Sequence, residues 1–477
     1  MHALNSRLRD TKEKALRINL DPRRYGTFAE IGAGQEVVRW FFQVGGAAGT
    51  IAKSVSAYDM TVSDAIYGRA DRYVSRARIE AMLDHEHSLN LDRLRESRGA
   101  STAFFAFADT VSGRSYRGTN ECHGWMGVKF QSHLRDQDSR ILIHVRMLDR
   151  ENAAQQEALG IVGVNLLYGA FFQFHDPEEL VESLLDGLST QRIEIDMIEF
   201  SGIEFRHVDN RLMSMKLVEL GLSGAAMFGP KGEVLQPSEA LYKKRLLLER
   251  GSFRPVCYAH IDMMSSARQR LDADVASERP TETVEIAELT LRNLRGDREE
   301  VDRSDFLARA DMLAAVGKTV LISDYSAFHR LASYLFRYTR ARSGMVLGAG
   351  TLGELFDESA YADLDGGMLE GLGRLLRNEL TVYVYPLLDP KTGTLTTADS
   401  FDPGERWRGL YDSLVTRGSI QKLDNYTPEY LPIFSKDVLE LIRRGDPSWE
   451  RLVPPEVAGV IRDGRALGFR PSGRSAA

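Results

Sequence analysis

Cysteine is almost absent from this sequence of 477 residues. The two cysteines, Cys122 and Cys257, cannot build a disulfide framework, and no CxxC metal motif is present. The chain also lacks a run of 18 apolar residues, so we expect no transmembrane helix. The basic segment 1–26 lacks the apolar stretch of a secretion signal. Together these absences predict a cytoplasmic protein in a reducing compartment.

An excess of positive charge is missing as well. The chain has 61 Lys and Arg against 68 Asp and Glu, a net charge of −7. A general nucleic-acid binder would normally show a basic domain or stripe, so we expect neither a nucleic-acid nor a membrane partner. A small-molecule substrate fits this composition, and an oligomer is compatible with it. The length exceeds what one hydrophobic core supports, which predicts two or three domains.

Hydrophobic periodicity along the chain predicts a multi-domain α/β protein with mixed or parallel sheets flanked by helices. Residues 1–100 form a mainly helical region, 101–240 an α/β domain beginning with an antiparallel meander, and 241–465 a βαβ-type domain. Residues 466–477 are expected to be a flexible tail. Within the second region, the apolar segment 161–172 is interpreted as a strand, and residues 229–232 as a hairpin turn.

The segment LLLERGSFRPVCYAH carries the clearest reaction motif. A leucine-rich strand runs into a glycine turn, and a helix begins near its last histidine. This resembles the Gly-x-Phe-x-Pro-x-His-x-x-His signature of nucleotidyltransferases that make nicotinate or nicotinamide dinucleotides. The matching positions are Gly251, Phe253, Pro255 and His260, whereas Cys257 and Ala259 depart from the pattern.

The resemblance implies adenylyl transfer from Mg²⁺-bound ATP to a phosphorylated small molecule such as nicotinate mononucleotide. His260 would stabilise the α-phosphate, and the turn Gly251-Ser252-Phe253 would bind the nucleotide, with backbone N–H groups cradling phosphates. The alternative is a strand exit with a glycine turn in a non-catalytic protein, or in a protein that binds another small molecule or nucleotide.

A later segment, VLISDYSAFHRL, is similar to the Ile-Ser-x-Thr-x-x-Arg element of the same family. The resemblance assigns Ser323 and Arg330 to the leaving pyrophosphate. The spacing inside the segment differs from the family's, and its distance in sequence from His260 is shorter than usual.

The early turn FAEIGAGQEVV offers a second nucleotide-binding candidate. Glu30, Gly32 and Gly34 between a strand and a helix resemble the nucleotide loop of Rossmann-type methyltransferases or dehydrogenases. Val37 occupies the place of the third glycine in the dinucleotide spacing. The glycines further along, at 45, 46 and 49, are explained as well by a helix C-cap followed by close Ala/Gly helix packing.

Other polar clusters have ordinary explanations. Residues 84–87 (Asp-His-Glu-His) are adjacent on a helix and face different directions, so no metal site is expected there. Cys122 and His123 alternate along a strand and point to opposite faces, which disfavours a dyad. Asp209 is interpreted as a helix cap near a sheet edge where ligands collect. Asp262 either serves Mg²⁺ or complements a helix dipole.

Overall fold

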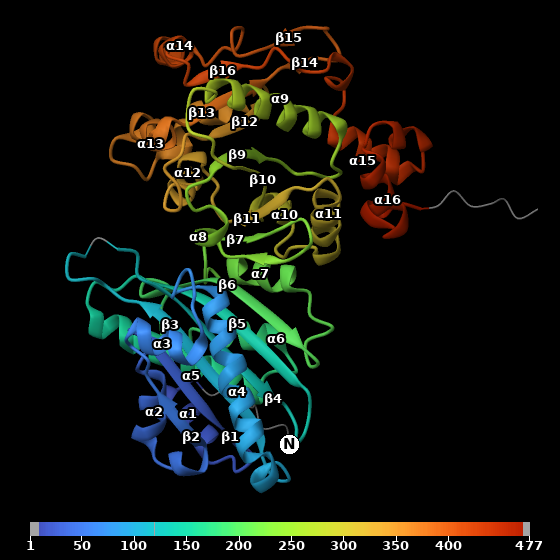
Figure 1. Ribbon diagram of the computed structural model, residues 1–477. Coiled ribbons are helices and arrows are strands. Elements are labelled where there is room, and N and C mark those ends of the chain that lie inside the picture. The colour runs from blue at the N-terminus through green and yellow to red at the C-terminus, as the bar shows by residue number, and fades with distance from the viewer. Residues whose placement is uncertain (1–8, 119, 471–477) are drawn as a thin grey trace, which may run out of the picture. The chain divides into compact units, whose positions relative to one another are not determined.

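The computed structural model describes residues 9–118 and 120–470, and these form an α/β protein with two compact units. Unit 1 comprises Met1–Ser223 and unit 2 comprises Gly224–Ala477 (Figure 1). Within the described residues, no helix is long and apolar enough to cross a bilayer. Part of the expected flexible tail, residues 471–477, lies outside the described residues.

Unit 1 is built on a six-stranded mixed sheet with the order β2-β1-β3-β4-β5-β6. The strands β1 to β3 are parallel, and β3 to β5 form the predicted antiparallel meander. The strand β6, which follows two helices, adds antiparallel to β5. Strands from the expected regions 1–100 and 101–240 therefore share one sheet. The strands are β1 (Arg24–Gly32), β2 (Ile51–Val55), β3 (Ala103–Ser112), β4 (His123–Gln131), β5 (Asp138–Met147) and β6 (Ile193–Gly202).

Helices cover both faces of this sheet. The long helix α4 packs on one face, and α1, α2 and α5 pack together on the other. The helices are α1 (Thr11–Asn19), α2 (Val37–Val44), α3 (Met60–Tyr67), α4 (Arg76–Arg98), α5 (Asn152–Phe172), α6 (Pro177–Ser183) and α7 (Asn210–Glu219).

The interpretation of residues 161–172 as a strand is wrong, because they form the second half of α5. This helix is buried almost all round, so its sequence shows no amphipathic period. Gly160 and Gly163 lie against Trp40 and Val37 of α2, where a Cβ atom would clash. The periodicity of a short apolar run does not distinguish a buried helix from a buried strand. Here the close packing of α5 against α2 favours the helix.

Unit 2 contains an eight-stranded sheet with the order β16-β13-β12-β9-β10-β11-β7-β8. The six strands from β16 to β11 are parallel, and β7 and β8 form the predicted hairpin at the other edge. The strands are β7 (Ala225–Phe228), β8 (Val234–Leu235), β9 (Arg245–Arg250), β10 (Thr283–Thr290), β11 (Thr319–Ser323), β12 (Gly344–Gly348), β13 (Thr381–Tyr385) and β16 (Ile420–Lys422). A separate pair joins β14 (Leu387–Leu388) and β15 (Leu395–Thr396).

Alternate residues of β9 enter two different cores. Leu246 and Leu248 pack with residues of α12 and α13, whereas Leu247 packs with residues of α9. This alternation covers both faces of the parallel sheet, as expected for βαβ units. The helices of unit 2 are α8 (Pro237–Ala240), α9 (Tyr258–Asp274), α10 (Leu291–Arg295), α11 (Arg303–Ala315), α12 (Phe328–Leu335), α13 (Gly367–Leu375), α14 (Arg408–Thr416), α15 (Ser435–Arg444) and α16 (Pro455–Asp463).

Numbered from β9, the six parallel strands follow the order 3-2-1-4-5-6 of dinucleotide-binding Rossmann-type sheets. The chain adds β10 and β11 on one side of β9, and then crosses back to add β12 on the other side of β9. The switch point therefore lies between the carboxyl ends of β9 and β12. Ligands of open α/β sheets bind at this position.

Candidate functional site

A cleft of about 720 Å³ opens at the carboxyl ends of the parallel strands of unit 2. Its wall takes the last residues of β9 and β10, and residues that follow β11 and β12. These are Arg250 and Gly251 at β9, Thr290 at β10, Ser326 to Phe328 after β11, and Thr351 after β12. Cleft and switch point therefore coincide, which makes this the candidate binding site of unit 2.

Arg250 fixes the floor of this cleft. Its guanidinium donates to both oxygens of the fully buried Glu288 carboxylate, at 2.7 and 2.9 Å. It also donates to the carbonyl oxygens of Tyr325 and Ser326, both at 2.7 Å, and lies over the ring of Phe328. One buried cation thus ties β9 and β10 to the loop that begins α12.

Two groups that suit an anion face the cleft. The helix α12 has no side-chain cap at its N-terminus, and its first residues line the wall. Arg292 of α10 also lines the cleft, is exposed, and makes no ion pair within the described residues. Free amides at a helix N-terminus and an unpaired guanidinium are the groups that bind phosphate oxygens.

Two acidic residues also line the cleft. Glu354 and Asp357 line the cleft beyond β12, and Asp357 accepts a hydrogen bond from the Ser359 amide. The side chain of Ser359, and then its amide, hold the pKa of Asp357 below its usual value, so the carboxylate is ionised at neutral pH. Oxygen ligands of this type fit Mg²⁺ that arrives with a nucleotide.

The structure places the predicted turn at the edge of the cleft. Gly251 lines it, but its amide donates to the Glu288 carbonyl, and a Cβ atom here would meet the Phe253 ring. Ser252 is exposed, and its carbonyl accepts from Arg309 of α11. Phe253 is buried with its ring against His260.

His260 acts within its own helix. Its Nδ1 accepts a hydrogen bond from the Cys257 amide at 3.0 Å, which caps the N-terminus of α9. Burial lowers the pKa of His260 to about 4, so the ring is neutral at pH 7. Its neighbour Asp262 accepts from the hydroxyls of Tyr385 and Thr427 at 2.7 Å each, which fastens α9 to two later segments.

The residues of the segment VLISDYSAFHRL lie in different environments. Ser323 is buried and donates to Glu288 beneath the cleft, whereas Arg330 is half-exposed and pairs with Asp363. Ser326, between them in sequence, does line the cleft. The structure therefore brings Gly251 and Ser326 to the cleft, and it does not place His260, Ser323 or Arg330 on its wall.

The early glycine turn lies in unit 1 after β1 and is tightly packed. Gly32 has φ of +78° and a Cβ atom there would meet the Val111 carbonyl, while one on Gly34 would meet the Asp109 carboxyl. Glu30 accepts from the amides of Val37 and Val38, at 2.8 and 3.2 Å. The first amides of α2 are thereby bonded within the protein.

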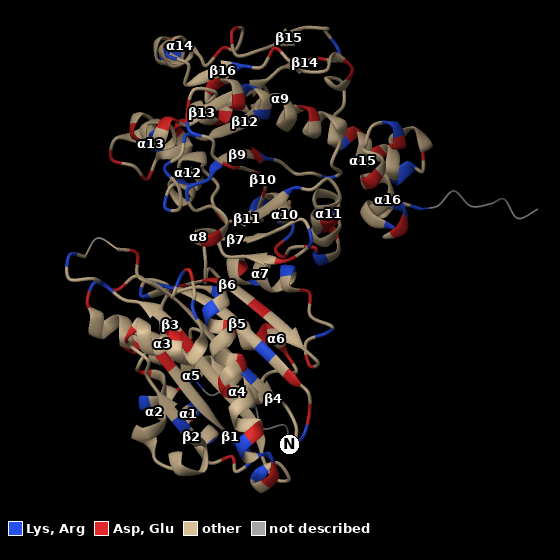
Figure 2. Cartoon of the chain, viewed as in Figure 1, with Lys and Arg blue, Asp and Glu red and all other residues tan. Residues whose placement is uncertain are grey.

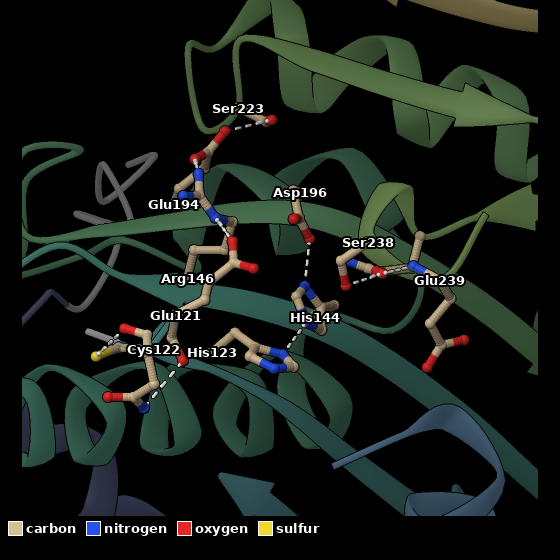
Figure 3. A network of polar contacts seen from close by, with 12 residues as sticks. Glu121, Cys122, His123, His144, Arg146, Glu194, Asp196, Ser223, Ser238 and Glu239 are labelled. Carbon is tan, nitrogen blue, oxygen red and sulfur yellow. Dashed lines mark hydrogen bonds and ion pairs between the residues drawn. The ribbon is translucent and has the colours of Figure 1, made fainter. Parts of the chain in front are cut away.

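Two polar clusters of unit 1 escaped the sequence-based prediction. His133, Asp136 and Glu204 offer ligand atoms within 4.8 Å of one another, although His133 is well exposed. The second cluster joins His123 to residues of β5 and β6 (Figure 3). His133 and Glu204 are 71 positions apart in sequence, and His123 and Asp196 are 73 apart. Only the strand pairing brings them together.

Comparisons with known proteins give slight likenesses. No family model and no curated protein matches the chain. Among solved structures, the competence/damage inducible protein CihA of Agrobacterium tumefaciens is 16% identical, with a TM-score of 0.22, over 32% of this chain and 88% of that chain. A CinA superfamily protein of Klebsiella pneumoniae is 14% identical, with a TM-score of 0.25, over 33% and 96% of the two chains. Such low scores assign neither a family nor a function.

Figure 2 shows how charge is distributed over the two units. Basic and acidic residues are interspersed along the chain in both, and no long stretch of one sign stands out in this view. Arg292 in the cleft therefore does not belong to a basic patch. Its distinguishing feature is that no acidic residue in the described part of the chain pairs with it.

Proposed function

We propose that unit 2 binds a nucleotide or a similar phosphorylated small molecule in the cleft at the ends of β9 to β12. The observation that carries this proposal is the coincidence of the cleft with the switch point of a 3-2-1-4-5-6 sheet. Arg292 and the uncapped start of α12 would bind the phosphates. Glu354 and Asp357 would hold the accompanying Mg²⁺, and no other metal is part of the proposal.

Nucleotidyl transfer is the finer form of this proposal. The segment Gly251–His260, which resembles the nucleotidyltransferase signature, favours it. Mg²⁺ would neutralise charge on the phosphates, and Arg292 would hold the departing pyrophosphate. A protein that binds a nucleotide without reacting it is the second candidate, because His260 is engaged in the cap of α9.

Ligand binding is tested first. Isothermal titration of the full-length protein with MgATP is expected to show binding, and Arg292→Ala is expected to weaken it about tenfold or more. A charge-assisted hydrogen bond contributes about 1.5–3 kcal/mol, which corresponds to that factor. Arg298→Ala is the matched control, because Arg298 is paired with Asp302 and does not line the cleft. Equal affinities of both variants would contradict the proposed site.

The class of ligand is tested by thermal shift. ATP, NAD and S-adenosylmethionine are compared at equal concentrations, since a ligand that binds the folded state raises the melting temperature. Stabilisation by ATP that is lost in Arg292→Ala supports the proposal. Release of pyrophosphate from ATP and nicotinate mononucleotide then separates transfer from binding alone.

A further inference from the structure

Three side chains on adjacent strands of unit 1 form a continuous chain of hydrogen bonds (Figure 3). The Asp196 carboxylate of β6 and Nδ1 of His144 of β5 are 2.6 Å apart. Nε2 of His144 and Nδ1 of His123 of β4 are 2.9 Å apart. Asp196 and His144 are buried, with 0% and 1% of their side chains exposed, while His123 is partly exposed.

The backbone of β6 is shaped for this contact. His144 pairs with Met197, but the next residue, Val145, pairs with Ile195, so Asp196 is the extra residue of a bulge. A bulge turns a side chain away from the regular alternation, and bulges are common beside functional sites. The ring of Trp125 lies edge-on to His144, with centroids 5.1 Å apart, and shields it from water.

The acceptor at the buried end dictates where the protons lie. An ionised carboxylate only accepts hydrogen bonds, so His144 donates through Nδ1. When His144 is neutral, its Nε2 carries a lone pair and accepts a hydrogen bond. His123 must then donate through Nδ1, which leaves the lone pair of His123 on Nε2.

The outer end of this chain is available. Nε2 of His123 has no hydrogen-bond partner within the described residues. Burial is the largest cause that lowers the pKa of His123 to about 4. Arg146 is itself paired with Glu121 and Glu194. The imidazole is therefore unprotonated throughout the physiological pH range.

We propose that His123 is the reactive imidazole of a second site, in which the relay Asp196–His144–His123 lets Nε2 accept an acyl group from an activated acyl donor. A bond forms between Nε2 and the carbonyl carbon, and the bond to the leaving oxygen breaks with its electron pair. The Nδ1 proton of His123 passes to Nε2 of His144, where the Asp196 carboxylate stabilises the new imidazolium. Water then hydrolyses the acyl-imidazole to the carboxylic acid, and His144 releases its proton.

Nitrogen-15 NMR of the histidine-labelled protein tests the proton positions. At pH 7 we expect the signals of His123 to show a protonated Nδ1 and an unprotonated Nε2, and this pattern is expected to persist at pH 5.5. A proton on Nε2 of His123 would overturn the relay as described. The spectra of His123→Gln identify the signals of that ring.

Chemical reactivity tests the function. Diethyl pyrocarbonate is expected to modify His123 at similar rates at pH 7.5 and pH 5.5, as measured by mass spectrometry of peptides. An unperturbed imidazole in a model peptide slows about tenfold over this range, because it protonates near pH 6.5. A tenfold decrease at His123, or no modification of it, would contradict the proposal.

Turnover of p-nitrophenyl acetate provides the second readout. We expect His123→Gln to lower p-nitrophenol release at least tenfold, while His133→Asn, which removes an exposed imidazole outside the relay, leaves it unchanged. His144→Gln is expected to slow modification of His123 several-fold. If His144→Gln does not fold, as judged by circular dichroism, the turnover of His123→Gln still tests the proposal. Equal turnover of His123→Gln and the unsubstituted protein would overturn the proposal.

Discussion

The two units bury carboxylates in opposite ways. In unit 2, Glu288 at the end of β10 meets the guanidinium of Arg250, which satisfies both of its oxygens. In unit 1, Glu30 of β1 and Asp109 of β3 lie directly opposite one another in parallel register, and none of the residues that the structure describes places a cation between them. The difference shows that burial alone does not define the charge of an acidic group, since its partner decides whether it is ionised.

The acid pair of unit 1 makes that unit sensitive to pH. Desolvation raises the pKa of Glu30 to about 8 and that of Asp109 well above its usual value, so this pair is largely protonated at neutral pH. Glu288, doubly bonded to a guanidinium, is an acceptor for Arg250 and Ser323 and holds the loop before α12. Unit 1 thus contains a buried pair of acids with raised pKa values. In unit 2 the Glu288 carboxylate holds Arg250 and Ser323 in place beneath the cleft.

The largest effect is expected from breaking the ion pair of unit 2. Arg250→Met leaves Glu288 buried without its cation, and this typically costs about 3–5 kcal/mol. We expect the free energy of unfolding of unit 2 to fall by that amount, and MgATP binding to be lost with it. Urea unfolding followed by hydrogen–deuterium exchange assigns the change to β9, β10 and the loop before α12.

The matched control is Arg330→Met in the same unit. Arg330 and Asp363 are about half-exposed, with 51% and 50% of their side chains accessible, and such pairs contribute about 0–1 kcal/mol. If Arg250→Met and Arg330→Met lowered the free energy of unfolding equally, the buried pair would contribute no more to stability than the exposed pair.

Much of the fold was predictable from local pattern, and the exceptions have identifiable causes. The antiparallel strands of 101–147, the hairpin at 229–232 and the parallel series after residue 245 were predicted because their periods and turns are encoded locally. The helix at 152–172 was missed because a fully buried helix and a buried strand have the same composition. The order of strands in a sheet depends on contacts between residues distant in sequence, so local patterns do not locate the switch point between β9 and β12.

The candidate sites show the same difference between local patterns and contacts formed by folding. Gly251 stood out because glycine turns are visible in sequence, and it does lie on the cleft. Arg250 was overlooked, although a charged residue that ends a leucine-rich strand is a signal that could have drawn attention to it. Its partner Glu288 lies 38 residues away, and Asp196 and His144 are separated by 52, so neither pairing was visible before folding.

A medium-sized effect is expected at the acid pair of unit 1. Because the folded-state pKa of Glu30 is raised from 4.5 to about 8, its contribution to stability is full below pH 4.5 and is lost as pH rises toward 8. Glu30→Gln keeps an acceptor for the α2 amides but cannot ionise. We expect it to stabilise unit 1 at pH 8 by about 1–3 kcal/mol, the usual cost of a poorly compensated buried polar group.

The measurement for Glu30→Gln is urea unfolding at pH 5 and pH 8, read from the fluorescence of Trp40 and Trp125 in unit 1. The unsubstituted protein is expected to lose stability between these values, and the variant to lose less. Asp10→Asn serves as a control, since this exposed acid caps α1 and lies outside the pair. A variant with the same pH dependence as the unsubstituted protein would show that Glu30 is ionised in the folded state.

The smallest effect is expected at His260 and runs in the opposite direction with pH. Its folded-state pKa is lowered from 6.5 to about 4, so its contribution to stability is full above pH 6.5 and is lost as pH falls toward 4. His260→Ala removes the acceptor for the Cys257 amide, and the loss of a cap costs about 1 kcal/mol. We expect urea unfolding of unit 2 at pH 7 to show this loss with MgATP affinity unchanged. If adenylyl transfer occurs and its rate falls more than a hundredfold in His260→Ala at unchanged affinity, the ring acts on the reaction as the nucleotidyltransferase resemblance implies, and its role as a cap is secondary.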